Sequence, residues 1–309
     1  MSDVIIIKDR RGNKIGEVHL DLSDKNSNVL LLKKEISKIK RIAPIRQWLT
    51  IGDDDNKTIL DDNKRVLTTY PVVKNGVEVV VKDLGIQLGW TTVFYAEYLG
   101  PIIFYGAFYL IGRARGEMTT SQNIGLTIGV LHYVKRILET LFIHVFSRDS
   151  MPLASCWKNF LHYWIFFGTF IGVEYFMYYK DPGYSNLTKG IWIGLWALFE
   201  FLNFQCHKTL SNIRTEVPSK TLEDGSSINK RRKIPTGWGF DQVSCANYLW
   251  ETLAWVAFSG FSRCYTSYFF TAVSFYQMFV WALGKQRRYK KEFGKEFPRG
   301  RKAIIPFLI

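Results

Sequence analysis

The sequence predicts a multi-pass α-helical membrane domain of six or seven spans, preceded by a small soluble α+β domain. Residues 1–83 are charged and mixed in character, whereas most of the remainder is apolar and rich in aromatic residues. The apolar part divides into segments of about 20 residues, the length that crosses a bilayer as a helix. Lys and Arg, 41 of the 309 residues, lie mostly between or after these segments. This distribution is typical of cytosolic loops and argues against nucleic acid as the partner of the +14 net charge.

The region up to residue 83 carries strand, turn and helix signals. β-branched or alternating segments predict strands, and one segment with apolar residues at helical spacing predicts an amphipathic helix. In order, these are strands at 4–7 and 15–20, a helix at 29–42, and strands at 47–51 and 77–81. The order ββαββ resembles a ubiquitin-like (β-grasp) fold. Since the chain continues into an apolar segment without a free Gly-Gly end, we expect this domain to act in docking or folding and not in conjugation.

Several apolar segments are candidate membrane spans. They lie at 84–112, 125–146, 160–179, 191–206, 243–261 and 265–283. Pro101 is expected to kink or divide the first, and a missed re-entrant segment would raise the span count to seven. An even count places the N-domain, the loop 207–240 and the tail 285–302 on one side of the membrane. The positive-inside rule makes that side cytosolic.

Other sequence features concern the compartment and the kinds of site that are absent. The N-terminus lacks the basic region and long apolar run of a secretory signal. The cysteines form no CxxC pair and no disulfide framework, which favours the endoplasmic reticulum over the plasma membrane. They are Cys156, Cys206, Cys245 and Cys264. No HExxH or Walker motif is present, so we expect no metal, and without GxGxxG a nucleotide cofactor would not occupy a Rossmann domain.

The segment 125–146 contains charged groups at a depth where charge is unfavourable, by about 2.5–3.5 kcal/mol per central residue on insertion scales. The helical period places His132, Arg136 and Glu139 on one face, with Lys135 alongside. The group is an interhelical salt-bridge cluster, the end of a helix that lies in the lipid headgroups, or a polar site that faces a cofactor or cavity. Other polar residues in or beside the apolar segments favour the last interpretation. They are Glu97, Asn203, His207, Asn247 and Glu251.

The basic tail, residues 287–302, ends in the apolar segment 304–309. A tail that served only as an electrostatic anchor to anionic lipid would not need this apolar end. We therefore expect the tail to fold back and pack, which would present arginines to a phosphate-rich ligand. The basic loop 230–233 is a second candidate for phosphate binding.

Several short motifs together resemble the steroid 5α-reductase family, and within it the very-long-chain trans-2-enoyl-CoA reductases. The motifs are Ala-Glu-Tyr-Leu-Gly-Pro at 96–101, His-Tyr-Val-Lys-Arg at 132–136 with 139–144, Val-Ser-Cys-Ala-Asn-Tyr at 243–248 with Glu251, and the tail at 289–307. The resemblance covers essentially the whole chain. It implies a ubiquitin-like domain at 1–83 and a membrane reductase domain at 84–309.

The resemblance also implies site residues. It places NADPH binding on Asn203, Arg214, Asn247, Tyr289 and Arg301. The family's substrate-polarising pair falls on Glu97 and Tyr133, and its proton donor in enoyl-CoA reductases on Tyr248, where the steroid-reducing branch tends to have Phe. Two departures are Ala246, where the enoyl-CoA branch usually has Pro, and one extra residue between Phe293 and Pro298, which makes the alignment of Tyr289 less secure.

The implied activity is NADPH-dependent reduction of trans-2-enoyl-CoA to saturated acyl-CoA, the last step of very-long-chain fatty-acid elongation. Tyr133, held by Glu97, is expected to donate to the thioester oxygen. Tyr248 is expected to protonate Cα. Arg214 and Arg301 are expected to clamp cofactor phosphates.

Alternative functions and the expected partners complete the sequence-based hypotheses. The alternatives are a reductase of steroids or other enones, a membrane methyltransferase, and a non-catalytic scaffold that displays the ubiquitin-like domain. The scaffold would leave the intramembrane charges without a role. Expected partners are the enoyl-CoA substrate, endoplasmic reticulum lipid and other enzymes of fatty-acid elongation, with no nucleic acid.

Overall fold

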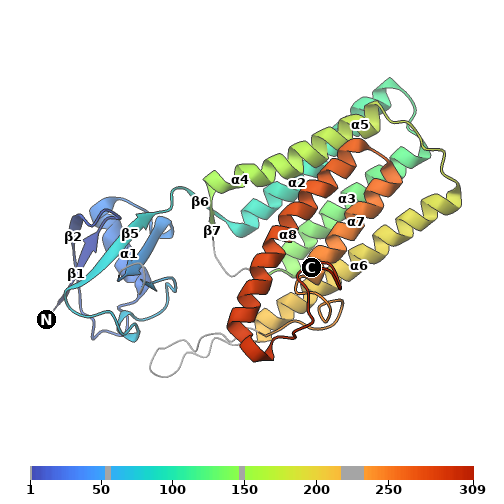
Figure 1. Ribbon diagram of the computed structural model, residues 1–309. Helices are drawn as coiled ribbons and strands as arrows, with labels where there is room; N and C mark the ends of the chain where they lie inside the picture. Colours follow the sequence, from blue (N-terminus) through green and yellow to red (C-terminus); the bar gives the residue numbers. More distant parts are fainter. Residues whose placement is uncertain (1, 53–56, 146–149, 217–232) are drawn as a thin grey trace. The chain divides into compact units, whose positions relative to one another are not determined.

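The computed structural model describes residues 2–52, 57–145, 150–216 and 233–309 and divides into two compact units (Figure 1). Of the described residues, unit 1 holds those up to Gly89 together with Ser150–Ala154, and unit 2 holds the others. The predicted phosphate-binding loop 230–233 lies, except for Lys233, outside the described residues.

Unit 1 is built on a five-stranded mixed sheet in the order β2-β1-β5-β3-β4. The central pair β1–β5 is parallel, and the other pairs are antiparallel. The elements are β1 (Asp3–Lys8), β2 (Lys14–Leu20), α1 (Val29–Lys40), β3 (Gln47–Ile51), β4 (Thr58–Ile59) and β5 (Val77–Asp83). The core includes Ile5 and Ile7 of β1, Leu32 and Ile36 of α1 and Val79 of β5. The predicted strands and helix of this region are therefore confirmed as elements.

Local hydrogen bonds set the ends of these elements. The side chain of Asn28 accepts a bond from the backbone N–H of Leu31 and caps the start of α1. Arg41, with a φ of 54°, ends the helix two residues earlier than predicted, since a left-handed residue cannot continue it. At the end of β5, Arg46 donates two bonds of 3.0 and 2.6 Å to Asp83. These bonds hold the pKa of Asp83 below its usual value.

A second, two-stranded sheet in unit 1 was not predicted. It pairs β6 (Gln87–Gly89) with β7 (Ser150–Pro152) in antiparallel register. The first predicted span, 84–112, therefore begins too early, and its helix starts at Trp90. Gly85, with a φ of +74°, donates its N–H to Asp83 and turns the chain out of β5 before the pairing begins.

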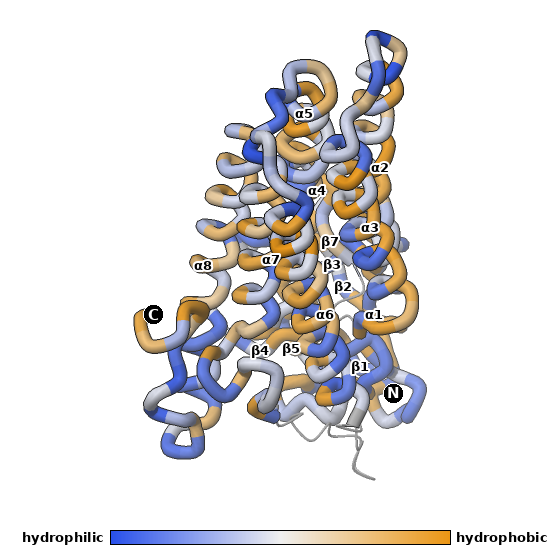
Figure 2. Tube along the Cα trace, turned by 90° about the vertical axis from the view of Figure 1, so that its right-hand side faces the viewer, coloured by the Kyte–Doolittle hydropathy of each residue, from blue (hydrophilic) through white to orange (hydrophobic). Residues whose placement is uncertain are grey.

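Unit 2 is a bundle of helices that run side by side (Figure 1). The helices are α2 (Trp90–Arg115), α3 (Thr120–Phe142), α4 (Leu153–Phe160), a π-helix (Leu161–Ile171), α5 (Gly172–Met177), α6 (Asn186–Glu216), α7 (Ala246–Ser262) and α8 (Tyr265–Phe293). Each apolar segment predicted as a span contains helix. Among the described residues, α2 alone is long and apolar enough to cross a membrane by length and composition. Hydrophobic residues recur along the outside of the other helices as well (Figure 2).

Helix α2 is not divided at Pro101, contrary to one of the two predicted outcomes. The indole of Trp164, from the π-helix, lies across α2 at this point and donates a bond of 2.9 Å to the carbonyl of Ala96. A side chain at Gly100 would overlap this indole, because a Cβ there would lie 1.9 Å from Nε1. Gly100 therefore allows the close contact between the π-helix and α2.

The tail folds back and packs, as predicted. Lys302 donates its N–H to the carbonyl of Gln242 at 2.9 Å and accepts from the N–H of Ser244 at 2.8 Å. Ala303 and Ile304 are fully buried against a cluster that includes Cys245, the residue before α7. The tail therefore holds the start of α7 in place.

Replacing Leu32 by Ala should lower the free energy of unfolding of unit 1 by about 2–5 kcal/mol, the range for deleting a buried leucine side chain. Leu32 has an exposed fraction of 0% at the centre of the unit 1 core. Hydrogen exchange of β1 and β5 amides in the full-length protein measures the change. The exposed neighbour Lys34 gives the control Lys34→Ala, and equal exchange in the two variants would contradict the assigned core.

Candidate active site

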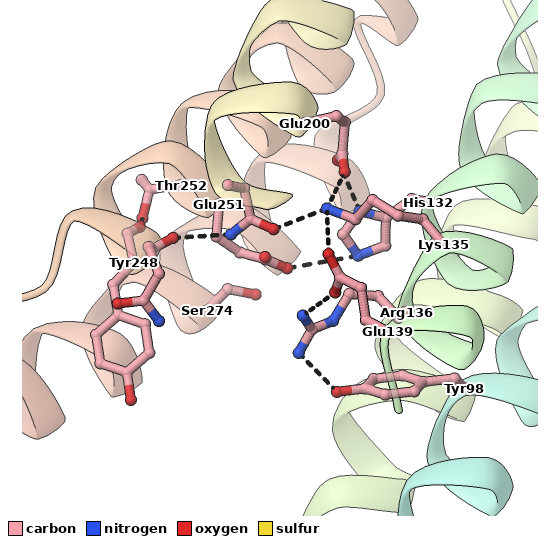
Figure 3. Close-up of polar contacts among 12 residues, drawn as sticks. Tyr98, His132, Lys135, Arg136, Glu139, Glu200, Tyr248, Glu251, Thr252 and Ser274 are labelled. Carbon is pink, nitrogen blue, oxygen red and sulfur yellow. Dashed lines mark hydrogen bonds and ion pairs between the residues drawn. The ribbon is translucent and has the colours of Figure 1, made fainter. Parts of the chain in front are cut away.

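The charged residues of α3 form an ion-pair network with α6 and α7 in the interior of unit 2 (Figure 3). His132 faces two carboxylates, with Nδ1 at 2.7 Å from Glu200 of α6 and Nε2 at 3.4 Å from Glu251 of α7. Lys135 Nζ lies 2.5 Å from the second oxygen of Glu200 and 3.7 Å from Glu139. One face of α3 is therefore bound electrostatically to two other helices.

Arg136 extends the network toward α2. Its Nη1 lies 2.6 Å from Glu139, which in turn lies 3.0 Å from Nδ1 of His207 on α6. Its Nη2 donates a bond of 2.9 Å to the hydroxyl of Tyr98 on α2. The interpretation as an interhelical salt-bridge cluster is therefore confirmed, and the interpretation as a site that faces a cofactor or cavity stays a prediction. The cluster also gathers polar groups from α2, α3, α6 and α7 at one place.

Glu139, His144 and His207 offer potential metal-ligand atoms within 4.8 Å of one another. The guanidinium of Arg136 already lies against two of them, at 2.6 Å from Glu139 and 3.0 Å from His207. A divalent cation would be repelled by this fixed positive charge. We therefore assign these residues to the ion-pair network and not to a metal centre.

Two predicted cofactor-binding residues lie beside the network. Asn203 of α6 accepts a bond of 2.7 Å from Lys135 and donates one of 2.9 Å to the backbone carbonyl of Asn247 on α7. The side-chain oxygen of Asn247 is buried and has no hydrogen-bond partner among the described residues. Since a buried polar atom without a partner is unfavourable, this oxygen is a candidate ligand-binding atom.

The other predicted cofactor-binding residues lie at the end of the bundle near the tail. Arg214 is exposed and donates to the backbone carbonyl of Val145. Arg301 is buried, and its Nη1 donates a bond of 3.0 Å to the carbonyl of Pro235 while its Nε has no partner among the described residues. Tyr289 packs against aromatic rings of the tail region. Arg301 thus keeps an unsatisfied buried donor, whereas Arg214 is held at the surface.

The predicted pairing of Glu97 with Tyr133 is wrong. Glu97 accepts instead from the side-chain amide of Asn159 on α4. The hydroxyl of Tyr133 is buried without a hydrogen-bond partner among the described residues. The ring of Tyr98, next to Glu97 on α2, lies 6.4 Å from that of Tyr133. Because adjacent helical residues point about 100° apart, Tyr98 faces the network and Glu97 faces α4.

Tyr248 lies in the first turn of α7 and is half-buried. The Nζ of Lys285 on α8 lies 5.2 Å from the centre of its ring, and the ring of Trp281 lies 6.2 Å away. Figure 3 shows Tyr248 one turn from Glu251, on the helix whose Asn247 oxygen is unpaired. The predicted proton donor is therefore one helical turn from a residue of the polar network, with its phenol directed away from the charged side chains.

The sequence analysis missed Glu200, Tyr98 and Lys285. Glu200 carried a usable signal, since it is a carboxylate inside the apolar segment 191–206. Tyr98 carried none, because a tyrosine in an aromatic-rich helix is usually a packing residue. Lys285 was counted with the basic tail, although its side chain contacts Tyr248.

Comparison with known proteins identifies the class to which this site belongs. Residues 149–309 match the family described as 3-oxo-5-alpha-steroid 4-dehydrogenase. The chain belongs to this family, the steroid 5α-reductases.

Full-length relatives place the chain in the enoyl-CoA reductase branch of the family. It is 35% identical to the very-long-chain enoyl-CoA reductase of Dictyostelium discoideum, over 100% of both chains. It is 32% identical, again over 100% of both, to a Caenorhabditis elegans protein named "probable very-long-chain enoyl-CoA reductase". It is also 30% identical to the mouse trans-2,3-enoyl-CoA reductase-like protein, over 74% of this chain and 63% of the relative.

Replacing Glu200 by Ala should lower the stability of unit 2 by about 3–5 kcal/mol, because it removes the carboxylate that pairs with the half-buried Lys135 and binds the buried ring of His132. The thermal midpoint of the detergent-purified protein measures this change. Lys208→Ala, on the exposed face of the same helix, is the control. Equal midpoints for the two variants would show that the network does not hold the helices together.

Proposed function

We propose that this protein catalyses the NADPH-dependent reduction of trans-2-enoyl-CoA to saturated acyl-CoA, the last step of very-long-chain fatty-acid elongation. The observation that carries the proposal is the full-length similarity to the Dictyostelium very-long-chain enoyl-CoA reductase. Tyr248, one turn from Glu251 of the network, supports it as well, since the reaction needs a positioned acid.

Unsatisfied buried atoms fit a nicotinamide nucleotide. The Asn247 oxygen can accept from an amide N–H, and the Arg301 Nε can donate to a phosphate oxygen. The residues proposed to hold NADPH are Asn203, Arg214, Asn247, Tyr289 and Arg301. When bound, this cofactor supplies a hydride to Cβ of the enoyl thioester.

The chain's own groups would provide the remaining chemistry. Negative charge that develops on the thioester oxygen needs hydrogen-bond donors in a site that excludes water. The unpaired hydroxyl of Tyr133 is one candidate donor. The phenol of Tyr248 is the proposed acid for Cα, because a strongly basic enolate carbon can take a proton from a weak acid. Glu97 is bound to Asn159 and would support the reaction indirectly, through the packing of α2.

The exposed apolar residues of unit 2 support a membrane location. Large hydrophobic side chains on the helix surfaces have exposed fractions that reach 66% for Leu110, 76% for Phe142 and 48% for Phe269. A contiguous apolar exterior of this kind suits lipid. We place the protein in the endoplasmic reticulum membrane as a multi-pass protein of six or seven spans, with its N-domain and basic tail in the cytosol, where acyl-CoA and NADPH are found.

Unit 1 is proposed to be a ubiquitin-like β-grasp domain. The support is its mixed sheet, with parallel central strands β1 and β5, packed against helix α1. The domain would dock other enzymes of the elongation cycle. We expect its removal to abolish docking and to leave reduction unchanged.

Replacing Tyr248 by Phe should lower kcat by about 10²–10⁴-fold, the usual contribution of a positioned general acid. The measurement is NADPH oxidation by detergent-purified protein with a long-chain trans-2-enoyl-CoA. Tyr276→Phe is the matched control, because it also removes a tyrosine hydroxyl, but from an exposed residue of α8.

The substrate class is tested in the same assay. Full activity of Tyr248→Phe would move the acid to another residue. A wild-type protein that binds NADPH but turns over steroid enones and not enoyl-CoA would replace this proposal by the steroid reductase. A protein that turns over neither would favour the scaffold.

A further inference from the structure

The hydroxyl of Tyr98 has an unusual environment for a tyrosine of an apolar helix. Tyr98 has an exposed fraction of 1%. Its oxygen accepts a bond of 2.9 Å from Nη2 of Arg136, and the guanidinium carbon lies 5.2 Å from the centre of its ring. Figure 3 shows Tyr98 at the edge of the network, beyond Arg136. A buried hydroxyl is thus held by a fixed positive charge.

The proton of this hydroxyl is available to a ligand. A tyrosine oxygen that accepts from a guanidinium still carries its own O–H donor. Among the described residues, the hydrogen-bond partner of this hydroxyl is Arg136, and a guanidinium cannot accept its proton. Because a guanidinium withdraws electron density from the oxygen it contacts, the remaining O–H is a stronger donor than that of an isolated phenol.

Arg136 is itself held in position. Glu139 binds its Nη1 at 2.6 Å, and the same nitrogen lies 3.0 Å from Nδ1 of His207. With one nitrogen fixed by α3 and α6, the other is directed to Tyr98 on α2. The donor that polarises Tyr98 is therefore preorganised and needs no rearrangement during a reaction.

The surroundings of Tyr98 suit an acyl thioester more than water. The ring of Tyr163 lies 5.6 Å away and that of Phe94 5.6 Å away. Tyr133, at 6.4 Å, adds a second buried hydroxyl without a hydrogen-bond partner among the described residues. Tyr98, Tyr133 and Tyr163 thus bring three hydroxyls into one aromatic region, and among the described residues that of Tyr98 is the one bonded to a cation.

We propose that Tyr98 is a catalytic residue whose O–H donates a hydrogen bond to the thioester oxygen of the enoyl-CoA, with Arg136 as its positioning residue. The inference rests on the proposed function and assigns to Tyr98 the role that sequence analysis gave to Tyr133 held by Glu97.

The proposed reaction is balanced in electrons and protons. Hydride addition at Cβ moves the alkene electron pair between Cα and the carbonyl carbon, and the carbonyl pair moves to oxygen. The enolate oxygen accepts the bond from Tyr98, which keeps its proton. The carbonyl then re-forms as Cα takes the proton of Tyr248, and solvent water reprotonates the Tyr248 phenolate. The alkene gains one hydride and one proton, and NADPH becomes NADP⁺.

The test is Tyr98→Phe in the full-length, detergent-purified protein, assayed for NADPH oxidation with a long-chain trans-2-enoyl-CoA. The expected loss in kcat is about 10²–10³-fold, typical of removing one oxyanion donor. Binding of NADPH, followed by tryptophan fluorescence, should be unchanged. Tyr105→Phe is the matched control, since Tyr105 is a fully buried tyrosine of the same helix with only a weak bond of 3.4 Å to Gly125.

A kinetic isotope effect separates this role from a structural one. NADPH deuterated at the transferring C4 position should give a larger primary isotope effect on kcat in Tyr98→Phe than in wild type, because hydride addition becomes slower. A kcat and isotope effect equal to wild type would overturn the inference and return the role to Tyr133. If Tyr98→Phe fails to bind NADPH, Tyr98→Leu takes its place with the same expected and contradicting results. An inactive wild type would instead contradict the proposed function, and this inference with it.

Discussion

Charge neutralisation inside unit 2 is the constraint on which the rest of the structure depends. Lys135 and Arg136 lie on a helix whose surroundings are mainly apolar, and unpaired charges there would be strongly unfavourable. The carboxylates that neutralise them come from α3 itself and from α6, and Glu251 of α7 faces His132 of α3. Because an ion pair requires close approach, this pairing fixes how these helices lie against one another. The same contacts carry Asn203 and Asn247 to one place and direct Arg136 to Tyr98.

Stability and chemistry therefore use the same residues. A buried ion network is not by itself an efficient way to stabilise a bundle, since apolar side chains of similar volume often do as well or better. Its presence is easier to explain as a means of holding donors and acceptors in fixed positions. The atoms left unsatisfied at its margin, the Asn247 oxygen and the Tyr133 hydroxyl, are the ones that a ligand could complete.

Much of this arrangement could be predicted from the sequence, because local rules govern it. Alternation and helical periodicity predicted β1, β2, α1, β3 and β5 of unit 1 and the helical segments of unit 2, but not the two-residue strand β4. The apolar end after a basic segment predicted that the tail packs, and helical spacing predicted the shared face of His132, Arg136 and Glu139. The sequence could not predict that Glu97 binds Asn159 instead of Tyr133, because this depends on which face of α2 meets α4. The strand pair β6–β7 joins segments about 60 residues apart, and neither three-residue strand has a signal of its own.

We propose that the geometry of the network, and not only its charge, creates the reductive site. Arg136→Lys tests it most directly, because lysine keeps the positive charge but cannot bind Glu139 and Tyr98 through two separate nitrogens of one planar group. The measurement is kcat for NADPH oxidation with a long-chain trans-2-enoyl-CoA, together with NADPH affinity. We expect Arg136→Lys to fold, to bind NADPH and to lose about 10²-fold or more in kcat, as for a lost oxyanion donor. A kcat equal to that of wild type would contradict it.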